Sequence, residues 1–162
     1  MKLRHLFFAC SGVFVMMFSL LLLVVIVFSD EEDGGSGGNL IYGGVSVSQE
    51  VLARKPMLEK YAREYGIEEY LNVLLAIIQV ESGGTLEDVM QSSESLGLPP
   101  NSLSTEESIK QGCKYFSELL AAAETKGCDL NSVVQSYNYG GGFLDYVAGR
   151  GKKYTFELAE SF

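Results

Sequence analysis

The sequence predicts an all-α domain that is preceded by one transmembrane helix and a glycine-rich linker. Three observations support this fold class. A run of uncharged residues lies near the N-terminus, apolar residues recur at three- and four-residue spacings from residue 48 onward, and alternating strand patterns are almost absent. Residues 48–162 have the length of one small domain, and no internal repeat divides them.

The transmembrane helix is predicted over residues 6–28, which contain no charged side chain. With a rise of about 1.5 Å per residue, this segment is long enough to cross a bilayer. Lys2, Arg4 and His5 precede it and four acidic residues follow it, so we expect residues 1–5 in the cytoplasm and the rest outside the cell membrane. A cleavable signal peptide is the alternative, but the apolar run exceeds the usual length of about 7 to 15 residues and no small-residue cleavage site ends it.

The linker, residues 29–47, combines four acidic residues with six glycines. Such a composition cannot bury a core and is typical of a flexible spacer. Beyond the apolar span, 10 basic and 21 acidic residues give the chain a net charge of −11. This acidity argues against nucleic acid as a partner and otherwise indicates a solvated surface.

Two helices of different character are predicted at the start of the domain. The first begins at Ser48 and ends at Gly66, and Pro56 is expected to kink it or to begin a fresh first turn. Its apolar face carries Val51, Leu58, Ala62 and Tyr65. The second helix, at about residues 68–82, is apolar on nearly every side and therefore belongs at the centre of a domain.

A loop rich in serine, glycine and proline follows, in which Leu86–Gln91 is expected to form a turn of helix. Ser104 and Glu107 then form a capping box for a helix that ends at Gly127. Its apolar side carries Ile109, Cys113, Phe116, Leu120 and Ala123. Two shorter helices are predicted at residues 129–137 and 143–148, the second ended by a glycine.

Cys113 and Cys128 bracket the capped helix and are expected to be buried, free thiols. An unbroken helix places their Cα atoms roughly 20 Å apart, whereas a disulfide requires less than about 7 Å. No cluster of cysteine and histidine predicts a metal or cofactor, and the single histidine, His5, lies on the cytoplasmic side.

Glu81 is the candidate catalytic residue, because it ends the most apolar helix and shares a face with Leu74, Ile77 and Ile78. Partial desolvation and the negative end of the helix dipole both disfavour the charged carboxylate, so both raise its pKa. A general acid for glycosidic bond cleavage requires such a pKa near neutral pH. The alternative is that Glu81 is a helix-ending acid that points into water.

Three short motifs accompany this residue in the chain. They are Glu81-Ser82-Gly83-Gly84, Met90-Gln91-Ser92-Ser93 and Tyr137-Asn138-Tyr139-Gly140. In this order they resemble the lysozyme-like domain of bifunctional cell-wall enzymes carried by Gram-positive conjugative elements, which is related to goose-type lysozymes and soluble lytic transglycosylases. The resemblance covers nearly all of residues 48–162. It implies a lysozyme-like helical fold that cleaves the β-1,4 bond between N-acetylmuramic acid and N-acetylglucosamine in peptidoglycan.

The same resemblance implies a role for each motif. Glu81 aligns with the catalytic acid, Ser82 orients that carboxylate or its loop, and Gln91, after Met90, lines the groove beside the N-acetyl group. Tyr137 and Asn138 hold the sugar at the cleavage site. The remaining motif residues expected at the substrate are Ser92, Ser93 and Tyr139. Without the family, the glutamine and serines would be explained as loop caps and the tyrosines as core aromatics.

Whether a second carboxylate acts beside Glu81 decides between hydrolysis and transglycosylation. Its candidates are Glu87, Asp88 and Glu94, of which Glu94 is preferred because it directly follows the second motif, in the stretch Gln-Ser-Ser-Glu-Ser. A water held by Glu94 gives inverting hydrolysis, the scheme we favour. Without such a partner, Glu81 alone would protonate the leaving oxygen and accept the proton of the muramic 6-hydroxyl, which gives the anhydro product of a lytic transglycosylase.

Other classes of function are a non-catalytic, membrane-anchored glycan-binding or assembly module, and a structural membrane protein whose helices pack with a secretion partner. A desolvated Glu81 argues against the binding or assembly module, because a binder has no need of a costly buried acid. The resemblance further suggests the conjugative secretion apparatus as a partner. The family usually continues into a cysteine peptidase domain, so we expect either a single-domain version or a piece of a longer protein.

Overall fold

A computed structural model describes residues 40–42 and 45–162, with side chains from residue 46 onward. The transmembrane helix predicted at residues 6–28 and most of the predicted linker lie outside the described residues. The elements, in chain order, are β1 (Leu40–Tyr42), β2 (Val45–Val47), α2 (Gln49–Glu64), the 3-10 helix η1 (Glu68–Tyr70), α3 (Leu71–Glu81), the 3-10 helix η2 (Ser93–Leu96), α4 (Thr105–Lys126), α5 (Leu130–Tyr139), α6 (Gly142–Ala148) and α7 (Phe156–Ser161).

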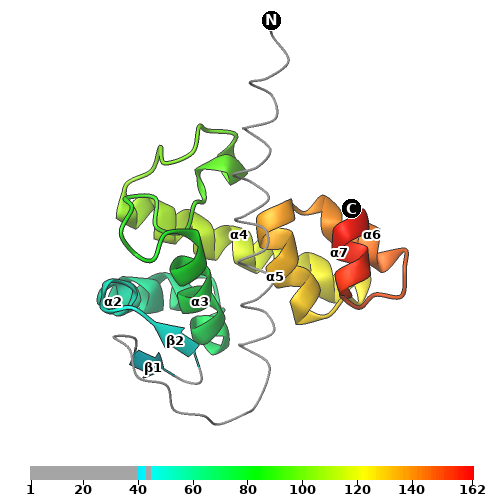
Figure 1. Cartoon of the computed structure of the whole chain (residues 1–162), viewed down its shortest axis with the longest axis horizontal. Coiled ribbons are helices and arrows are strands. Elements are labelled where there is room, and N and C mark those ends of the chain that lie inside the picture. The colour runs from blue at the N-terminus through cyan, green and yellow to red at the C-terminus, as the bar shows by residue number, and fades with distance from the viewer. Residues whose placement is uncertain (1–39, 43–44) are drawn as a thin grey trace, which may run out of the picture.

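The long helix α4 joins two groups of helices (Figure 1). On one side lie α2, α3 and the β1–β2 hairpin, and on the other lie α5, α6 and α7 (Figure 1). A main core joins the two groups, and a second, smaller core around Phe143 and Val147 lies under α6 and α7. The fold is helical apart from the short hairpin, which agrees with the predicted fold class.

The central helix is α3, as its composition predicts. Six consecutive residues, Val73 to Ile78, are buried, so the helix is surrounded on all sides. Residues 68–70, expected to start this helix, instead form the 3-10 turn η1. Glu81 is its last residue, and the chain leaves the core at this point.

Most predicted helix boundaries are confirmed. The Ser48 side chain caps α2, in which Pro56 lies inside a continuous helix. The capping box of Ser104 and Glu107 starts α4, and left-handed Gly127 ends it. Asp129 caps α5, which continues two residues beyond the predicted end, to Tyr139.

Three features differ from the sequence expectations. Residues 40–42 and 45–47, within the predicted linker, pair as an antiparallel hairpin, and Val47 is fully buried. Residues 156–161 form α7, for which no helix was predicted. The turn of helix expected over residues 86–91 is absent, and the next helical turn is η2.

Cys113 is buried and Cys128 is half-buried, and both are free thiols. Among the helices described here, none combines the length and apolar character needed to cross a membrane.

Candidate active site

A pocket of about 280 Å³ lies where the end of α3, the η2 loop, the end of α5 and the middle of α4 meet. Its volume is near the lower end of the range for ligand sites, so it holds only part of a polymeric ligand. The lining residues are Glu81, Gln91, Ser92, Glu94, Ser95, Tyr115, Tyr137, Asn138, Tyr139 and Gly140. Seven of the ten residues predicted to form the site are therefore brought together.

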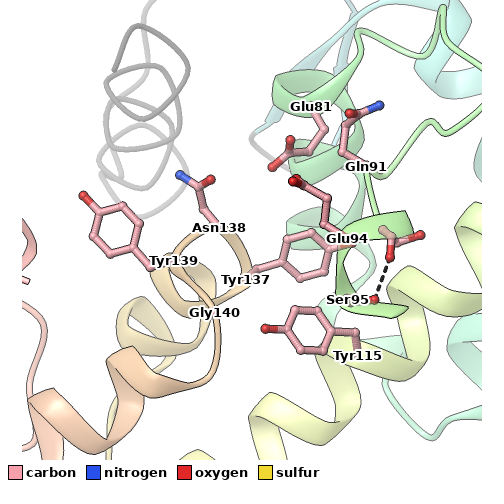
Figure 2. A pocket seen from close by; sticks show the side chains of 10 residues that line it. Glu81, Gln91, Glu94, Ser95, Tyr115, Tyr137, Asn138, Tyr139 and Gly140 are labelled. Atoms are coloured by element: carbon pink, nitrogen blue, oxygen red, sulfur yellow. Dashed lines mark hydrogen bonds between the residues drawn. The ribbon is translucent and has the colours of Figure 1, made fainter. Parts of the chain in front are cut away.

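Glu81 projects from the end of α3 into this pocket, and the Glu94 carboxylate points toward the same space (Figure 2). The pKa of Glu81 is raised to about 7. Burial is the largest cause, and the negative charges of Glu94 and Asp88 contribute as well. No lysine or arginine is among the residues that line the pocket. Glu81 is therefore partly protonated at neutral pH and can donate a proton.

The two glycines after Glu81 allow the chain to turn sharply away from α3. Gly83 and Gly84 have φ angles of +60° and +75°, in the left-handed region that favours glycine. A Cβ atom on Gly84 would lie 2.8 Å from the backbone of Glu50 in α2. This close approach explains why the helix-ending acid is followed by glycines.

Ser82 holds this turn together. Its Oγ donates to the Val89 carbonyl at 2.7 Å and accepts from the Gly84 amide at 3.0 Å. Of the two functions expected for Ser82, the contacts correspond to orienting the loop. Ser82 does not line the pocket.

Asp88 organises the loop between α3 and η2. Its carboxylate is fully buried and accepts hydrogen bonds from the amide groups of Ser92 at 2.9 Å and Ser93 at 3.2 Å. The hydroxyl of Ser93 also donates to it, and that of Ser108 in α4 donates at 2.6 Å. These bonds to a central side chain tie the loop to α4 just before η2 begins.

The buried network separates the three candidates for the second carboxylate. The Asp88 oxygens are occupied by four donors inside the protein, so Asp88 cannot act on a substrate directly. Glu87 is exposed and does not line the pocket. Glu94 lines it, and its carboxylate accepts no hydrogen bond among the described residues.

Only part of the second motif, Met90-Gln91-Ser92-Ser93, lines the pocket, and the rest is buried behind it. Met90 was expected at the substrate but is fully buried, because its amide donates to Ser108 and its carbonyl accepts from Tyr137. Gln91 lines the pocket with a left-handed φ of +48°. Its Nε2 donates to the Asp88 carbonyl and to Asn101, so its Oε1 is left to accept a bond.

Of the two serines that follow, Ser92 faces the pocket and Ser93 does not. Ser92 lines the pocket although it is buried, and its Oγ donates to the Ser108 carbonyl at 2.9 Å. Ser93, expected at the substrate, instead lies behind the wall and is bound to Asp88. The pocket wall is therefore supported from α4.

The third motif forms the opposite side of the pocket, at the end of α5 (Figure 2). The Tyr137 hydroxyl donates to the Met90 carbonyl at 3.1 Å, so the ring, and not the hydroxyl, is available to a ligand. Asn138 is half-buried, and its amide makes no hydrogen bond within the described chain. Tyr139 points outward in Figure 2 and stacks against Phe162 with ring centroids 5.8 Å apart.

Three pocket residues are not among the ten that were expected to form the site: Ser95, Tyr115 and Gly140. Tyr115 lies in α4 beside the apolar stripe and is half-buried. A large aromatic residue just outside the buried face of an amphipathic helix is the signal that could have identified it. Within the described residues, no group of three or more histidine, cysteine, aspartate or glutamate side chains is placed to hold a metal ion.

Comparisons with known proteins show the family to which the chain is similar. A family model described as lysozyme-like matches residues 48–162. The bifunctional muramidase/DL-endopeptidase CwlT of Bacillus subtilis is 44% identical over 122 residues, which are 75% of this chain and 36% of that protein. The membrane protein YocA of the same organism is 40% identical over 67% of this chain and 48% of its own length.

A solved structure shares the fold at high identity. It is a Staphylococcus aureus protein described as similar to a lipoprotein of the NLP/P60 family, with a TM-score of 0.72 and 74% identity. The match covers 73% of this chain and 40% of that one. The chain thus spans less than half the length of each of these three proteins.

Proposed function

The chain belongs to the lysozyme-like family, and we propose that it is a muramidase that cleaves the β-1,4 bond between N-acetylmuramic acid and N-acetylglucosamine in peptidoglycan. The observation that carries the proposal is the pairing of Glu81 and Glu94 in one pocket without a basic residue. The name of the relative CwlT, a muramidase, supports the choice of bond.

Glu81 is the general acid in this proposal. Its raised pKa leaves a proton on the carboxyl at neutral pH, and this proton passes to the glycosidic oxygen as the bond to C1 of muramic acid breaks. N-acetylglucosamine then leaves as the free 4-hydroxyl, and Glu81 remains as a carboxylate.

Glu94 is the general base. Its exposed, unbonded carboxylate can hold a water, accept one of its protons, and direct the hydroxyl oxygen to C1. Positive charge that develops on the sugar ring is also stabilised by the negative charge of Glu94. The products are a reducing muramic end of inverted configuration and a protein whose two carboxyl groups exchange the proton through solvent.

The polar side chains of the rim hold the substrate. The free Gln91 Oε1 suits the N–H of an acetamido group, and the unbonded Asn138 amide suits sugar hydroxyls or the acetamido carbonyl. The Tyr137 ring supplies an apolar face beneath them. Ser92 and Tyr139 complete the contact, whereas Ser82, Met90 and Ser93 act by holding the loop.

A lytic transglycosylase reaction is the second candidate. Glu81 is the more buried of the two carboxyl groups, so it could serve both as acid and as base if the muramic 6-hydroxyl, and not water, attacked C1. The product would then carry a 1,6-anhydro ring. We favour hydrolysis because the Glu94 carboxylate is available in the same pocket.

We further propose that residues 6–28 anchor the enzyme in the cell membrane, with the domain outside the membrane at the cell wall. The apolar sequence and the membrane-protein name of the relative YocA support this location. A role beside the conjugative secretion apparatus is proposed from the sequence resemblance alone.

The test is digestion of purified peptidoglycan with the full chain, followed by mass spectrometry of the released muropeptides. Reducing muramic ends are expected, and anhydro ends would establish the transglycosylase reaction instead. Glu81→Gln should release nothing, while Glu87→Gln, an exposed neighbour, should act like the natural chain. A non-catalytic glycan-binding module would be indicated by binding without release.

A further inference from the structure

The turn that follows Glu81, residues 82–84, is hydrogen-bonded to the start of α2 as well as to the pocket loop. Ser82 ties it to the loop. Two other residues tie it to α2, Ser48 at the N-cap and Arg54 inside the helix. Helix α2 lies beside α3 (Figure 1), and neither of these two residues lines the pocket. The proposed bond cleavage therefore gives them no direct part.

We infer that Ser48 and Arg54 are positioning residues for the catalytic acid, because they fix the turn after Glu81 from the side of α2. The inference rests on the proposed function, since it takes Glu81 to be the proton donor. Neither residue touches the substrate in this role. Both act through the backbone of the turn, whose position determines where the Glu81 carboxyl lies in the pocket.

Ser48 makes three hydrogen bonds that join α2, α3 and the turn. Its hydroxyl donates to the Gly83 carbonyl at 3.1 Å and accepts from the Val51 amide at 3.3 Å, the bond that caps α2. Its amide donates at 2.7 Å to Oε1 of Gln79, which lies two residues before Glu81. Capping a helix requires only the acceptor function of a hydroxyl. The bond that Ser48 donates to Gly83 is therefore additional to capping.

Arg54 binds the next carbonyl of the turn. Its side chain is half-buried, and its Nη2 donates to the Gly84 carbonyl at 3.3 Å. Two consecutive carbonyl groups of the turn are thus bonded from α2 and its cap. The charges that shift the pKa of Glu81 are those of Glu94 and Asp88, so we expect Arg54 to act through position and not through its charge.

The two glycines make the turn dependent on these bonds. Gly83 and Gly84 both have left-handed φ angles, and glycine loses more conformational freedom on folding than any other residue. The end of a helix also frays readily, because its last carbonyl groups have no partner within the helix. Without the two bonds from α2, the end of α3 and Glu81 would be free to move.

Movement of the turn would bring the Glu81 carboxyl into water. Burial is the largest cause of its raised pKa, so exposure lowers the pKa toward that of a free carboxyl. A reacting group misplaced by about 1 Å can cost roughly 100-fold in rate. The positioning role therefore predicts a lower pKa of Glu81 and a lower kcat. It predicts little change in KM, because neither Ser48 nor Arg54 lines the pocket.

The first experiment measures the pKa of Glu81 by NMR, in full-length chains with 13C-labelled glutamate carboxyl groups. Ser48→Gly removes the hydroxyl but leaves a residue that is accepted at helix N-caps. Arg54→Met removes the guanidinium and keeps an unbranched stem. We expect each change to lower the pKa of Glu81 by about half a unit and the two together by about one unit. Ser48→Thr, which keeps the hydroxyl, should retain the natural pKa.

Ser104→Gly and Arg63→Met are the matched controls. Ser104 is also an N-cap serine, at the start of α4, and Arg63 is an exposed arginine of α2. Neither lines the pocket, and among the described residues neither is hydrogen-bonded to the turn after Glu81. Both controls should leave the pKa of Glu81 unchanged, although Ser104→Gly loses a capping hydroxyl as Ser48→Gly does.

Cleavage of a soluble peptidoglycan hexasaccharide gives a second readout. The chain with both Ser48→Gly and Arg54→Met should lose about tenfold in kcat while KM stays within about twofold. Its kcat should also begin to fall at a lower pH than that of the natural chain, because the acid loses its proton sooner. A general loss of stability would reduce the active fraction without moving this pH.

An unchanged pKa of Glu81 in both Ser48→Gly and Arg54→Met, or equal falls in the two controls, would overturn the inference. A fall in only one of the two variants would overturn it for the other residue. Failure of the proposed function has a different signature, because the natural chain would then release no muropeptides. The NMR measurement needs no activity, so it would still decide whether α2 holds the turn.

Discussion

Glu94 lines the same pocket as Glu81, and its negative charge adds to burial in raising the pKa of Glu81. The two carboxyl groups have different environments. Glu81 is half-buried at the end of an apolar helix, whereas Glu94 lies exposed on a short 3-10 turn. Such a difference allows one group to keep a proton while the other stays charged, which is the division of roles that acid and base chemistry requires.

The pH dependence of activity should follow this pair. Glu81 must be protonated to act as the acid, so kcat/KM should fall as the pH rises through about 7. Replacing Glu94 with glutamine removes a like charge and should lower the pKa of Glu81. The change can be followed by NMR of chains with 13C-labelled glutamate carboxyl groups, even where activity is lost. An unchanged or raised pKa of Glu81 in Glu94→Gln would contradict the proposed pairing.

Glu81 should also make stability depend on pH. Its pKa is about 7 in the folded chain and near 4.5 in a free carboxyl, so the folded state holds the proton more tightly. The free energy of unfolding should therefore fall as the pH rises from about 4.5 to about 7. Glutamine cannot ionise, so the free energy of unfolding of Glu81→Gln should not fall in this way. At pH 8 the variant should be more stable than the natural chain by on the order of 2 kcal/mol, and at pH 4 the two should differ little.

Urea unfolding at the two pH values measures this difference. Glu87→Gln is the control, because Glu87 is exposed in the loop that follows Glu81. Equal effects of the two substitutions at pH 8 would show that the Glu81 carboxyl is not destabilised by its surroundings.

The sequence was sufficient to predict most of the helices and to single out Glu81 as the candidate acid, because both predictions depend on local signals. Ser104 with Glu107, and Gly127, define the ends of α4 by short-range hydrogen bonds, and the apolar run before Glu81 requires a central helix. The hairpin at residues 40–47 was not predicted, because six glycines and four acidic residues dominate that part of the chain. The alternation over its two three-residue strands is too short to detect.

The sequence could not predict which motif residues line the pocket and which are buried behind it. Met90 and Gln91 are adjacent, yet one is fully buried and the other lines the pocket. The direction of each depends on Asp88, whose partner Ser108 lies 20 residues later in α4. Tyr115 enters the pocket for a similar reason, because the end of α5 packs beside it only in the folded chain.

Asp88 should be essential for stability. Asp88→Ala leaves the buried amides of Ser92 and Ser93 and the Ser108 hydroxyl without their acceptor. Loss of charged, buried hydrogen bonds of this kind should lower the free energy of unfolding by about 3 kcal/mol or more. Guanidinium unfolding measures the loss, and Glu87→Ala, at the exposed neighbouring position, should change stability by less than about 0.5 kcal/mol. A loss below about 1 kcal/mol for Asp88→Ala would show that the network is not formed.

Gly112 tests the contact between α4 and the pocket floor. A Cβ atom at this helical glycine would lie 2.5 Å from Met90 Sδ and 2.9 Å from the Tyr137 hydroxyl oxygen. Both neighbours are buried and bonded to each other, so neither can move without loosening the loop or the floor. Alanine gains up to about 1 kcal/mol of helix propensity, but crowding in a packed core costs about 1 to 3 kcal/mol.

Gly112→Ala should therefore be destabilised by about 1 kcal/mol and should release muropeptides more slowly, since Met90 and Tyr137 support the pocket. Gly142→Ala is the matched control: Gly142 is also helical, but its added Cβ would meet Phe162 at an ordinary 3.7 Å. Thermal unfolding and muropeptide release measure both effects. Equal stability and activity of Gly112→Ala and Gly142→Ala would contradict this prediction. Such a result would mean that Met90 and Tyr137 do not pack against Gly112.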